Sequence, residues 1–91
     1  MDFYAEWCMA CKQMAKETFS DPRVQRSGAR FVAVRVDVTD DEGPGVKEIL
    51  QRYHVVGLPT LLLIDAPGRE RQRLTEFVGP DAFLGALREI R

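Results

Sequence analysis

Two cysteines separated by two residues lie where a predicted strand meets a predicted helix, and the 91-residue chain contains no others. They are Cys8 and Cys11, in the stretch WCMACK of residues 7–12. A disulfide across two intervening residues closes a very short loop and removes little entropy from the unfolded chain, so the spacing suits redox exchange better than structural cross-linking. A thiolate at a helix N-terminus is stabilised by unpaired N–H groups and the helix dipole. We therefore predict that Cys8 is the nucleophile.

Composition limits the classes of protein to consider. Hydrophobic residues make up 45% of the chain, which is enough for the core of one small domain spanning residues 1–91. The 13 Lys and Arg residues nearly balance the 14 Asp and Glu residues, which argues against nucleic acid as a partner. No apolar run approaches the roughly 20 residues of a membrane span, and no signal-peptide pattern is visible. We expect a monomeric domain that is not itself inserted in a membrane.

The first half of the chain alternates between strand and helix patterns. Cys11, Met14 and Phe19 recur at helical spacing, with charged residues between them. Asp21 can cap a second helix, and Pro22 suits its first position. Alternate valines from residue 32 to residue 38 are typical of a strand. These patterns predict a strand at 2–5, a helix at 8–19, a short helix at 22–27 and a strand at 31–38.

The second half continues the alternation. Residues 46–53 have helical periodicity, residues 60–64 form an apolar run typical of a buried strand, and residues 66–69 are a turn before a return strand at 73–78. A last helix starts at residues 79–81, with Phe83, Leu84, Leu87 and Ile90 on one face. The order is β-α-β-α-β-β-α, an α/β fold with a mixed four-stranded central sheet flanked by helices. Because helices connect the first three strands, we predict that these are parallel and that the fourth is antiparallel.

Two separated motifs allow a family to be recognised. The stretch DFYAEWCxxCK at residues 2–12 and the stretch GLPT at residues 57–60, in this order, resemble the thioredoxin superfamily over essentially the whole chain. Within it, TFSDPxV at residues 18–24 and VDVT at residues 36–39 are similar to the C-terminal thioredoxin-like domain of the DsbD family of transmembrane thiol:disulfide interchange proteins. The resemblance implies a thioredoxin fold, and we expect the chain to be part of a longer protein.

Two positions depart from these families. The DsbD domain usually carries a second acidic residue one helical turn after the second cysteine, where this chain has Ala15. Thioredoxins usually have a lysine near the buried acid, in the strand that corresponds to residues 31–38, and we assign that position to Ala33. Tuning of the thiols by a second acid is therefore not expected.

The resemblance also implies roles for individual residues. Asp2, six residues before Cys8, matches the family's buried acid and can accept the proton of Cys11. The Leu58–Pro59 bond is expected to be cis, which would leave the Leu58 backbone free to pair with an extended substrate. The predicted catalytic residues are Cys8, Cys11 and Asp2, and the predicted substrate-binding residues are Trp7, Met9, Ala10, Leu58 and Pro59.

The function predicted is that of a protein-disulfide reductase whose only redox group is the Cys8–Cys11 disulfide. Neither Met9 nor Ala10 supplies a cation to stabilise the Cys8 thiolate, which favours reduction over oxidation. By resemblance, the partners are a membrane-embedded dithiol donor and periplasmic redox domains, and the location is the periplasm, as the soluble domain of an inner-membrane protein. The cytoplasm is the alternative location.

Two other functions remain open. The first is a free-standing thioredoxin-like reductase that receives electrons from a soluble thioredoxin reductase. The second is a non-catalytic module that binds a metal or a partner. A zinc site needs four ligands, and His54 is the only histidine that could join the two cysteines. We therefore expect no metal.

Overall fold

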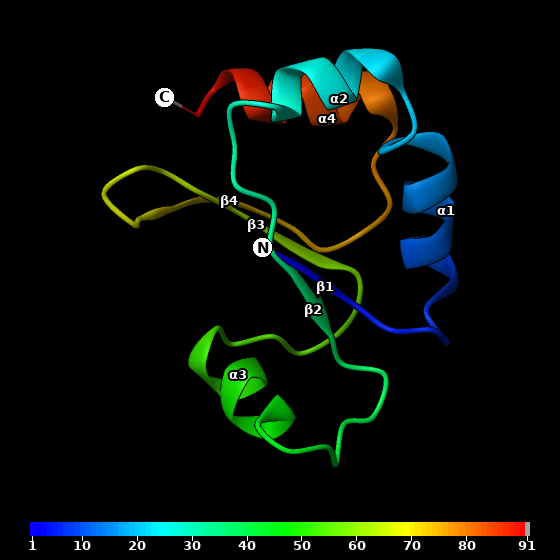
Figure 1. Cartoon of the computed structure of the whole chain (residues 1–91), viewed down its shortest axis with the longest axis vertical. Helices are drawn as coiled ribbons and strands as arrows, with labels where there is room; N and C mark the ends of the chain where they lie inside the picture. Colours follow the sequence, from blue (N-terminus) through cyan, green and yellow to red (C-terminus); the bar gives the residue numbers. More distant parts are fainter. Residues whose placement is uncertain (91) are drawn as a thin grey trace.

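The computed structural model describes residues 1–90 and contains one four-stranded sheet with helices on both sides (Figure 1). Helices α2 and α4 lie side by side over one side of the sheet, and α3 lies on the other (Figure 1). The predicted α/β order is confirmed. Its elements are β1 (Asp2–Tyr4), α1 (Met9–Glu17), α2 (Pro22–Gly28), β2 (Arg35–Asp37), α3 (Val46–Arg52), β3 (Thr60–Ile64), β4 (Glu70–Leu74) and α4 (Pro80–Arg88).

The strands are arranged in the order β2-β1-β3-β4. Phe3 in β1 pairs with Val36 of the parallel strand β2 and with Thr60 of the antiparallel strand β3. The prediction that the first three strands are parallel is therefore wrong for β3. Strand β2 ends beside the end of β1, and β3 begins at that same end, so α3 and its loops reverse the chain without carrying it back along the sheet. Strand β4 is antiparallel to β3, as predicted.

Strand β2 is shorter than the predicted strand at 31–38. The N–H of Asp2 donates to the carbonyl oxygen of Val34 (2.8 Å), and the ladder with β1 begins with Asp2 opposite Arg35. Residues 31–33 lie beyond the first residue of β1 and have no paired strand in the described chain. Val32 is accordingly 89% exposed, whereas Phe31 packs on the core beside α2 and α4.

Strand β4 begins three residues earlier than predicted. Asp65 closes the preceding turn, because its N–H donates to the carbonyl oxygen of Arg69 (3.0 Å) and its Oδ1 accepts the Arg69 N–H (2.8 Å). Gly68 has a φ of 95°, a left-handed conformation in which a glycine has no steric penalty. Pairing therefore starts with Ile64 opposite Glu70.

The helices begin where the sequence supplies capping groups. Cys8 is the N-cap of α1, and Asp21 is the N-cap of α2, where its Oδ1 accepts the N–H of Arg23 (2.8 Å). Pro22 and Pro80 occupy the first turns of α2 and α4, where a missing N–H is tolerated. Among the described residues, no helix reaches the length and apolar content that a bilayer crossing requires.

The core consists of two clusters, one on each side of the sheet. Alternate residues of β3 separate them, because Leu61 and Leu63 belong to the cluster under α2 and α4, whereas Leu62 belongs to the cluster beside α3. Leu62 is 1% exposed and Phe3, its neighbour in the second cluster, is 0% exposed. The second cluster also contains Cys8, so the residues that support the cysteines are part of the core itself.

Candidate functional site

Cys8 and Cys11 lie in the first turn of α1 and form a disulfide, with their Cα atoms 5.2 Å apart. The Cys8 sulfur also accepts the backbone N–H of Cys11 (3.1 Å), which satisfies one of the unpaired donors at the helix start. Cys8 is 5% exposed and Cys11 is partly buried. Cys8 is therefore nearly inaccessible in this disulfide form, because it packs into the cluster beside α3.

Two residues next to Cys8, Trp7 and Met9, are exposed, whereas Ala10 is packed against the core. Trp7 and Met9 flank Cys8 and are 62% and 76% exposed. The indole Nε1–H of Trp7 donates to the carbonyl oxygen of Thr39 (3.1 Å), so one edge of the ring is held. Ala10 instead packs against the cluster that contains Cys8. Two large apolar side chains therefore border the reactive cysteine in the sequence and face solvent.

The loop before β3 reaches the same cluster. The Leu58–Pro59 peptide bond is cis, as the resemblance implies. Leu58 packs against the cluster of Cys8, as do Ala10 and Cys11, and Pro59 is buried. The structure thus brings together the cysteine turn and the loop at 57–59, which are about fifty residues apart in the sequence.

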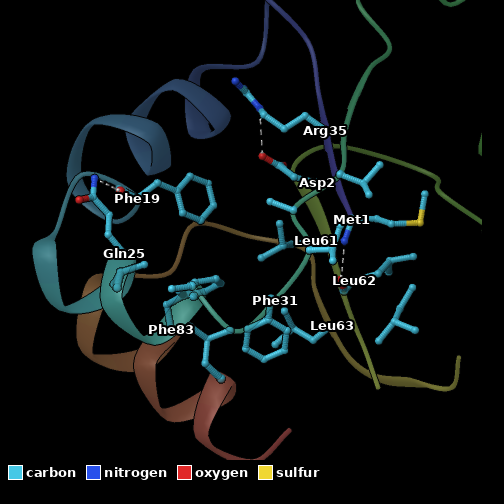
Figure 2. Close-up of a pocket in the computed structure, with 18 of the residues that line it drawn as sticks. Met1, Asp2, Phe19, Gln25, Phe31, Arg35, Leu61, Leu62, Leu63 and Phe83 are labelled. Carbon is cyan, nitrogen blue, oxygen red and sulfur yellow. Dashed lines mark hydrogen bonds and ion pairs between the residues drawn. The ribbon is translucent and has the colours of Figure 1, made fainter. Parts of the chain in front are cut away.

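Asp2 is positioned by β1 and is mostly buried, with 20% of its side chain exposed. Burial raises the pKa of its carboxyl group above the usual value, and the charges of Arg35 and of the terminal amino group oppose this shift. The Oδ2 of Asp2 lies 3.7 Å from the Nε of Arg35. Figure 2 shows the Asp2 carboxylate directed toward Arg35 in a pocket that Phe19 and Phe31 also line.

Asp2 and Cys11 line two pockets that share residues. Asp2 lines the larger one, which has a volume of about 630 Å³ and mainly apolar walls. Cys11 lines a smaller one of about 100 Å³. Ala15 and Arg35 line both pockets, so each of these residues borders the pocket of the predicted acid and that of the predicted resolving thiol. Because residue 15 is alanine, Asp2 is the only carboxylate among residues 1–90 that lines the larger pocket.

Sequence reasoning missed Arg35. Ala33, assigned to the family's lysine position, lines the same pocket as Asp2, and the register places Arg35, which was not considered, directly opposite Asp2. The guanidinium of Arg35 also lies 4.0 Å from the centre of the Tyr4 ring, a cation–π contact that orients it. The available signal was the pairing of the two strands through their central apolar residues, Phe3 and Val36, which sets Arg35 beside Asp2.

Sequence reasoning also missed Thr39, which follows β2 and contacts the turn before Cys8. Its Oγ1 accepts the backbone N–H of Glu6 (2.9 Å), and its carbonyl oxygen accepts the Trp7 indole N–H (3.1 Å). Thr39 occurs in the VDVT stretch that carried the resemblance, but only the structure shows which groups it meets. Within residues 1–90, no group of three or more His, Cys, Asp or Glu side chains is arranged to hold a metal ion.

Comparisons with known proteins agree with this geometry. A family model described as a thioredoxin-like domain matches residues 1–91. The DsbD thiol:disulfide interchange protein of Haemophilus influenzae is 40% identical over 99% of this chain, and that of Escherichia coli K12 is 41% identical over 98%. The chain spans 16% of the length of each of these curated relatives.

Solved structures show the same similarity. The C-terminal domain of Neisseria meningitidis DsbD, in its reduced form, has a TM-score of 0.84 and 33% identity, covering 99% of this chain and 77% of that one. A thioredoxin from Thermus thermophilus has a TM-score of 0.79 and 37% identity, covering 97% of this chain and 68% of that one. The chain therefore belongs to the thioredoxin-like domain family, and it is similar in both sequence and structure to the C-terminal domain of DsbD.

Proposed function

We propose that this chain is a protein-disulfide reductase that exchanges the Cys8–Cys11 dithiol with disulfides of partner proteins. The observation that carries the proposal is the disulfide in the first turn of α1, where the Cys8 sulfur accepts a backbone N–H. A thiolate at that atom would receive the same hydrogen bond and the favourable field of the helix start. The similarity to thiol:disulfide interchange proteins supports the same reaction.

The reaction has two displacement steps. In the first, the Cys8 thiolate attacks one sulfur of the partner's disulfide, a new S–S bond forms, and the other partner sulfur leaves as a thiolate that takes up a proton. In the second, Cys11 loses its proton and attacks the Cys8 sulfur of this mixed disulfide. The second partner thiolate then leaves, and two electrons have passed from the Cys8–Cys11 dithiol to the partner. The product form of the chain is the disulfide seen here.

Asp2 is the proton acceptor in the second step. Burial raises the pKa of Asp2. This reduces the difference between the pKa of Asp2 and that of a thiol, which favours proton transfer from Cys11 to Asp2. Asp2 and Cys11 line neighbouring pockets that share Ala15 and Arg35, so a proton transfer between them would pass through that region.

The substrate contacts the exposed apolar side chains and the loop before β3. Trp7 and Met9 supply the exposed apolar surface on both sides of Cys8. Ala10, Leu58 and Pro59 form the packed floor, since Ala10 and Leu58 contact the cluster that contains Cys8. The backbone at Leu58 would pair with an extended segment of the partner that carries its disulfide.

The similarity to DsbD supports a location and partners for the chain. We place it in the periplasm as one soluble domain, residues 1–91, of a longer inner-membrane protein. It would act as a monomer, receive electrons from a membrane-embedded dithiol and deliver them to periplasmic redox domains. Its only redox group would be the Cys8–Cys11 pair.

A second candidate is a free-standing thioredoxin-like reductase in the cytoplasm, which the similarity to the Thermus thermophilus thioredoxin favours. A turnover assay with a soluble thioredoxin reductase and its nicotinamide cofactor separates the two candidates. Rapid reduction of the Cys8–Cys11 disulfide by that enzyme would support the second candidate. Reduction only by a membrane-embedded dithiol protein would support the first.

The experiment that tests the reductase proposal is the reduction of insulin disulfides by the reduced chain. We expect the unmodified protein to consume one insulin disulfide per dithiol and Cys8→Ser to consume none, because no thiolate remains at the helix start. The matched control is Ser20→Ala, which removes a hydroxyl from the turn after α1 and leaves both cysteines in place. Insulin reduction by Cys8→Ser at the unmodified rate would exclude the proposal.

A further inference from the structure

Thr39 connects the loop after β2 with the turn that precedes Cys8. Its Oγ1 accepts the N–H of Glu6 (2.9 Å) and its carbonyl oxygen accepts the Nε1–H of Trp7 (3.1 Å). These two bonds hold consecutive residues of the turn, one through its backbone and one through its side chain. The residue that follows them is Cys8, whose N–H donates to the carbonyl oxygen of Ala5 (3.1 Å).

Asp37 in turn fixes Thr39. The Oδ1 of Asp37 accepts both the backbone N–H of Thr39 (2.9 Å) and its hydroxyl hydrogen (2.5 Å). The hydroxyl of Thr39 has one hydrogen, so donating it to Asp37 turns the oxygen's lone pairs toward the N–H of Glu6. These two bonds from Thr39 stabilise the ionised, accepting form of Asp37 and lower its pKa.

The held tryptophan is nevertheless exposed. Trp7 is 62% exposed, although its one polar atom is bonded to Thr39. The bond satisfies the edge of the indole and leaves much of the ring facing solvent, an arrangement that suits docking of an apolar segment. Met9, which is 76% exposed, lies on the other side of Cys8 in the sequence.

We propose that Asp37 and Thr39 are positioning residues, which hold the Glu6–Trp7 turn so that Trp7 receives the apolar residues beside a partner's disulfide. This inference rests on the proposed reductase function. Asp37 and Thr39 touch neither cysteine through a hydrogen bond, so their effect is on the docking of a protein substrate and not on the exchange between sulfur atoms.

A matched pair of variants tests the proposal. Thr39→Val keeps the shape of the side chain and removes the hydroxyl, whereas Thr39→Ser keeps the hydroxyl. We expect Thr39→Val to reduce insulin about three- to tenfold more slowly in single-turnover reactions, the effect of one lost hydrogen bond, and Thr39→Ser to restore most of the rate. A small aromatic disulfide needs no docking surface, so it should react equally fast with Thr39→Val, Thr39→Ser and the unmodified protein. An unchanged insulin rate in Thr39→Val, or an equal loss with the small disulfide, would overturn the proposal.

Trp7 supplies a readout that does not depend on activity, because it is the only tryptophan in the chain. We expect its emission and its quenching by a neutral quencher to change in Thr39→Val and Asp37→Asn, and to stay the same in Asp81→Asn, which removes an exposed carboxylate on α4. Unaltered Trp7 emission in the two variants would contradict the proposal. If Cys8→Ser and the unmodified protein reduce insulin equally, the reductase function fails, and the Trp7 emission still decides whether Thr39 holds the turn. If Thr39→Val does not fold, the insulin reduction rate and the Trp7 emission are measured on Asp37→Asn instead.

Discussion

The Oδ2 of Asp2 lies 3.7 Å from the Nε of Arg35, in a pair that joins the two parallel strands β1 and β2. The Asp2 side chain is mostly buried, whereas that of Arg35 is 60% exposed. Burial therefore dominates the pKa of Asp2, which is raised, and the charge of Arg35 opposes the shift only in part. The balance of these two effects sets how readily Asp2 accepts a proton.

Replacing Arg35 should change the pKa of Asp2. In Arg35→Gln, the opposing charge is lost while burial remains, so we expect the pKa of Asp2 to rise further. Carbon-detected NMR titration of the Asp2 carboxyl group measures this pKa directly. Arg88→Gln, which removes an exposed cation at the end of α4, serves as the control and should leave the Asp2 titration unchanged. An Asp2 pKa that stays the same or falls in Arg35→Gln would contradict the assigned effect of the Arg35 charge.

Asp2→Asn should stabilise the fold at neutral pH. The folded-state pKa of Asp2 is raised above its ordinary value of 3.8, so the folded chain holds the proton more tightly than the unfolded chain does. The stability of the unmodified protein therefore falls as pH rises from the ordinary value through the folded-state pKa. Urea unfolding should show Asp2→Asn to be the more stable protein at neutral pH, with a difference that disappears in acid. A less stable variant at neutral pH would contradict this reasoning.

Asp65→Asn should have the opposite effect. The backbone N–H of Arg69 is the largest cause that lowers the pKa of Asp65, and the side chains of Arg69 and Arg71 add to it. Because this folded-state pKa lies below the ordinary value, the stabilisation is complete above the ordinary value and is lost as pH falls through the folded-state pKa. We expect Asp65→Asn to unfold at lower urea concentrations than the unmodified protein at neutral pH, and the two to converge in acid. A constant difference at all pH values would mean that the Asp65 charge is not the cause.

Arg73 should contribute measurably to stability because it caps α3 from β4. Its guanidinium donates to the carbonyl oxygens of Tyr53 (2.7 Å) and His54 (3.1 Å), at the end of that helix. We expect Arg73→Ala to lower the free energy of unfolding by about 1–2 kcal/mol, the range for charged hydrogen bonds at a helix end. Lys47→Ala breaks an exposed ion pair with Glu42 and should cost less than about 0.5 kcal/mol. Equal losses in the two variants in urea unfolding would exclude the capping role.

Much of the fold follows from local sequence signals. Asp21 and Pro22 start α2 where predicted, and the apolar run at residues 60–64 forms β3 with its bounds unchanged. The direction of β3 was not predictable in the same way, because it depends on how α3 and its loops return the chain to the sheet. The length of β2 depends on its partner, since valine alternation favours a strand but cannot supply hydrogen bonds to residues 31–33.

The features of the candidate site also divide into those that local sequence signals predict and those that depend on tertiary contacts. The disulfide between Cys8 and Cys11 and the cis bond before Pro59 are found where motif and resemblance placed them. Arg35 and Thr39 were missed because their importance arises from strand register and from contacts between loops, which no local pattern records. The burial of Cys8 likewise depends on packing against the cluster beside α3.

The most direct test of the account is to trap the mixed disulfide with each single-cysteine variant. Cys11→Ser and Cys8→Ser are mixed with a disulfide-containing protein such as insulin, quenched with acid, and measured by intact mass and peptide mapping. We predict that Cys11→Ser accumulates a nearly stoichiometric adduct linked through Cys8, and that Cys8→Ser forms almost none, because only Cys8 occupies the N-cap of α1. An adduct that forms through Cys11 as fast as through Cys8 would contradict the assignment of Cys8 as the nucleophile.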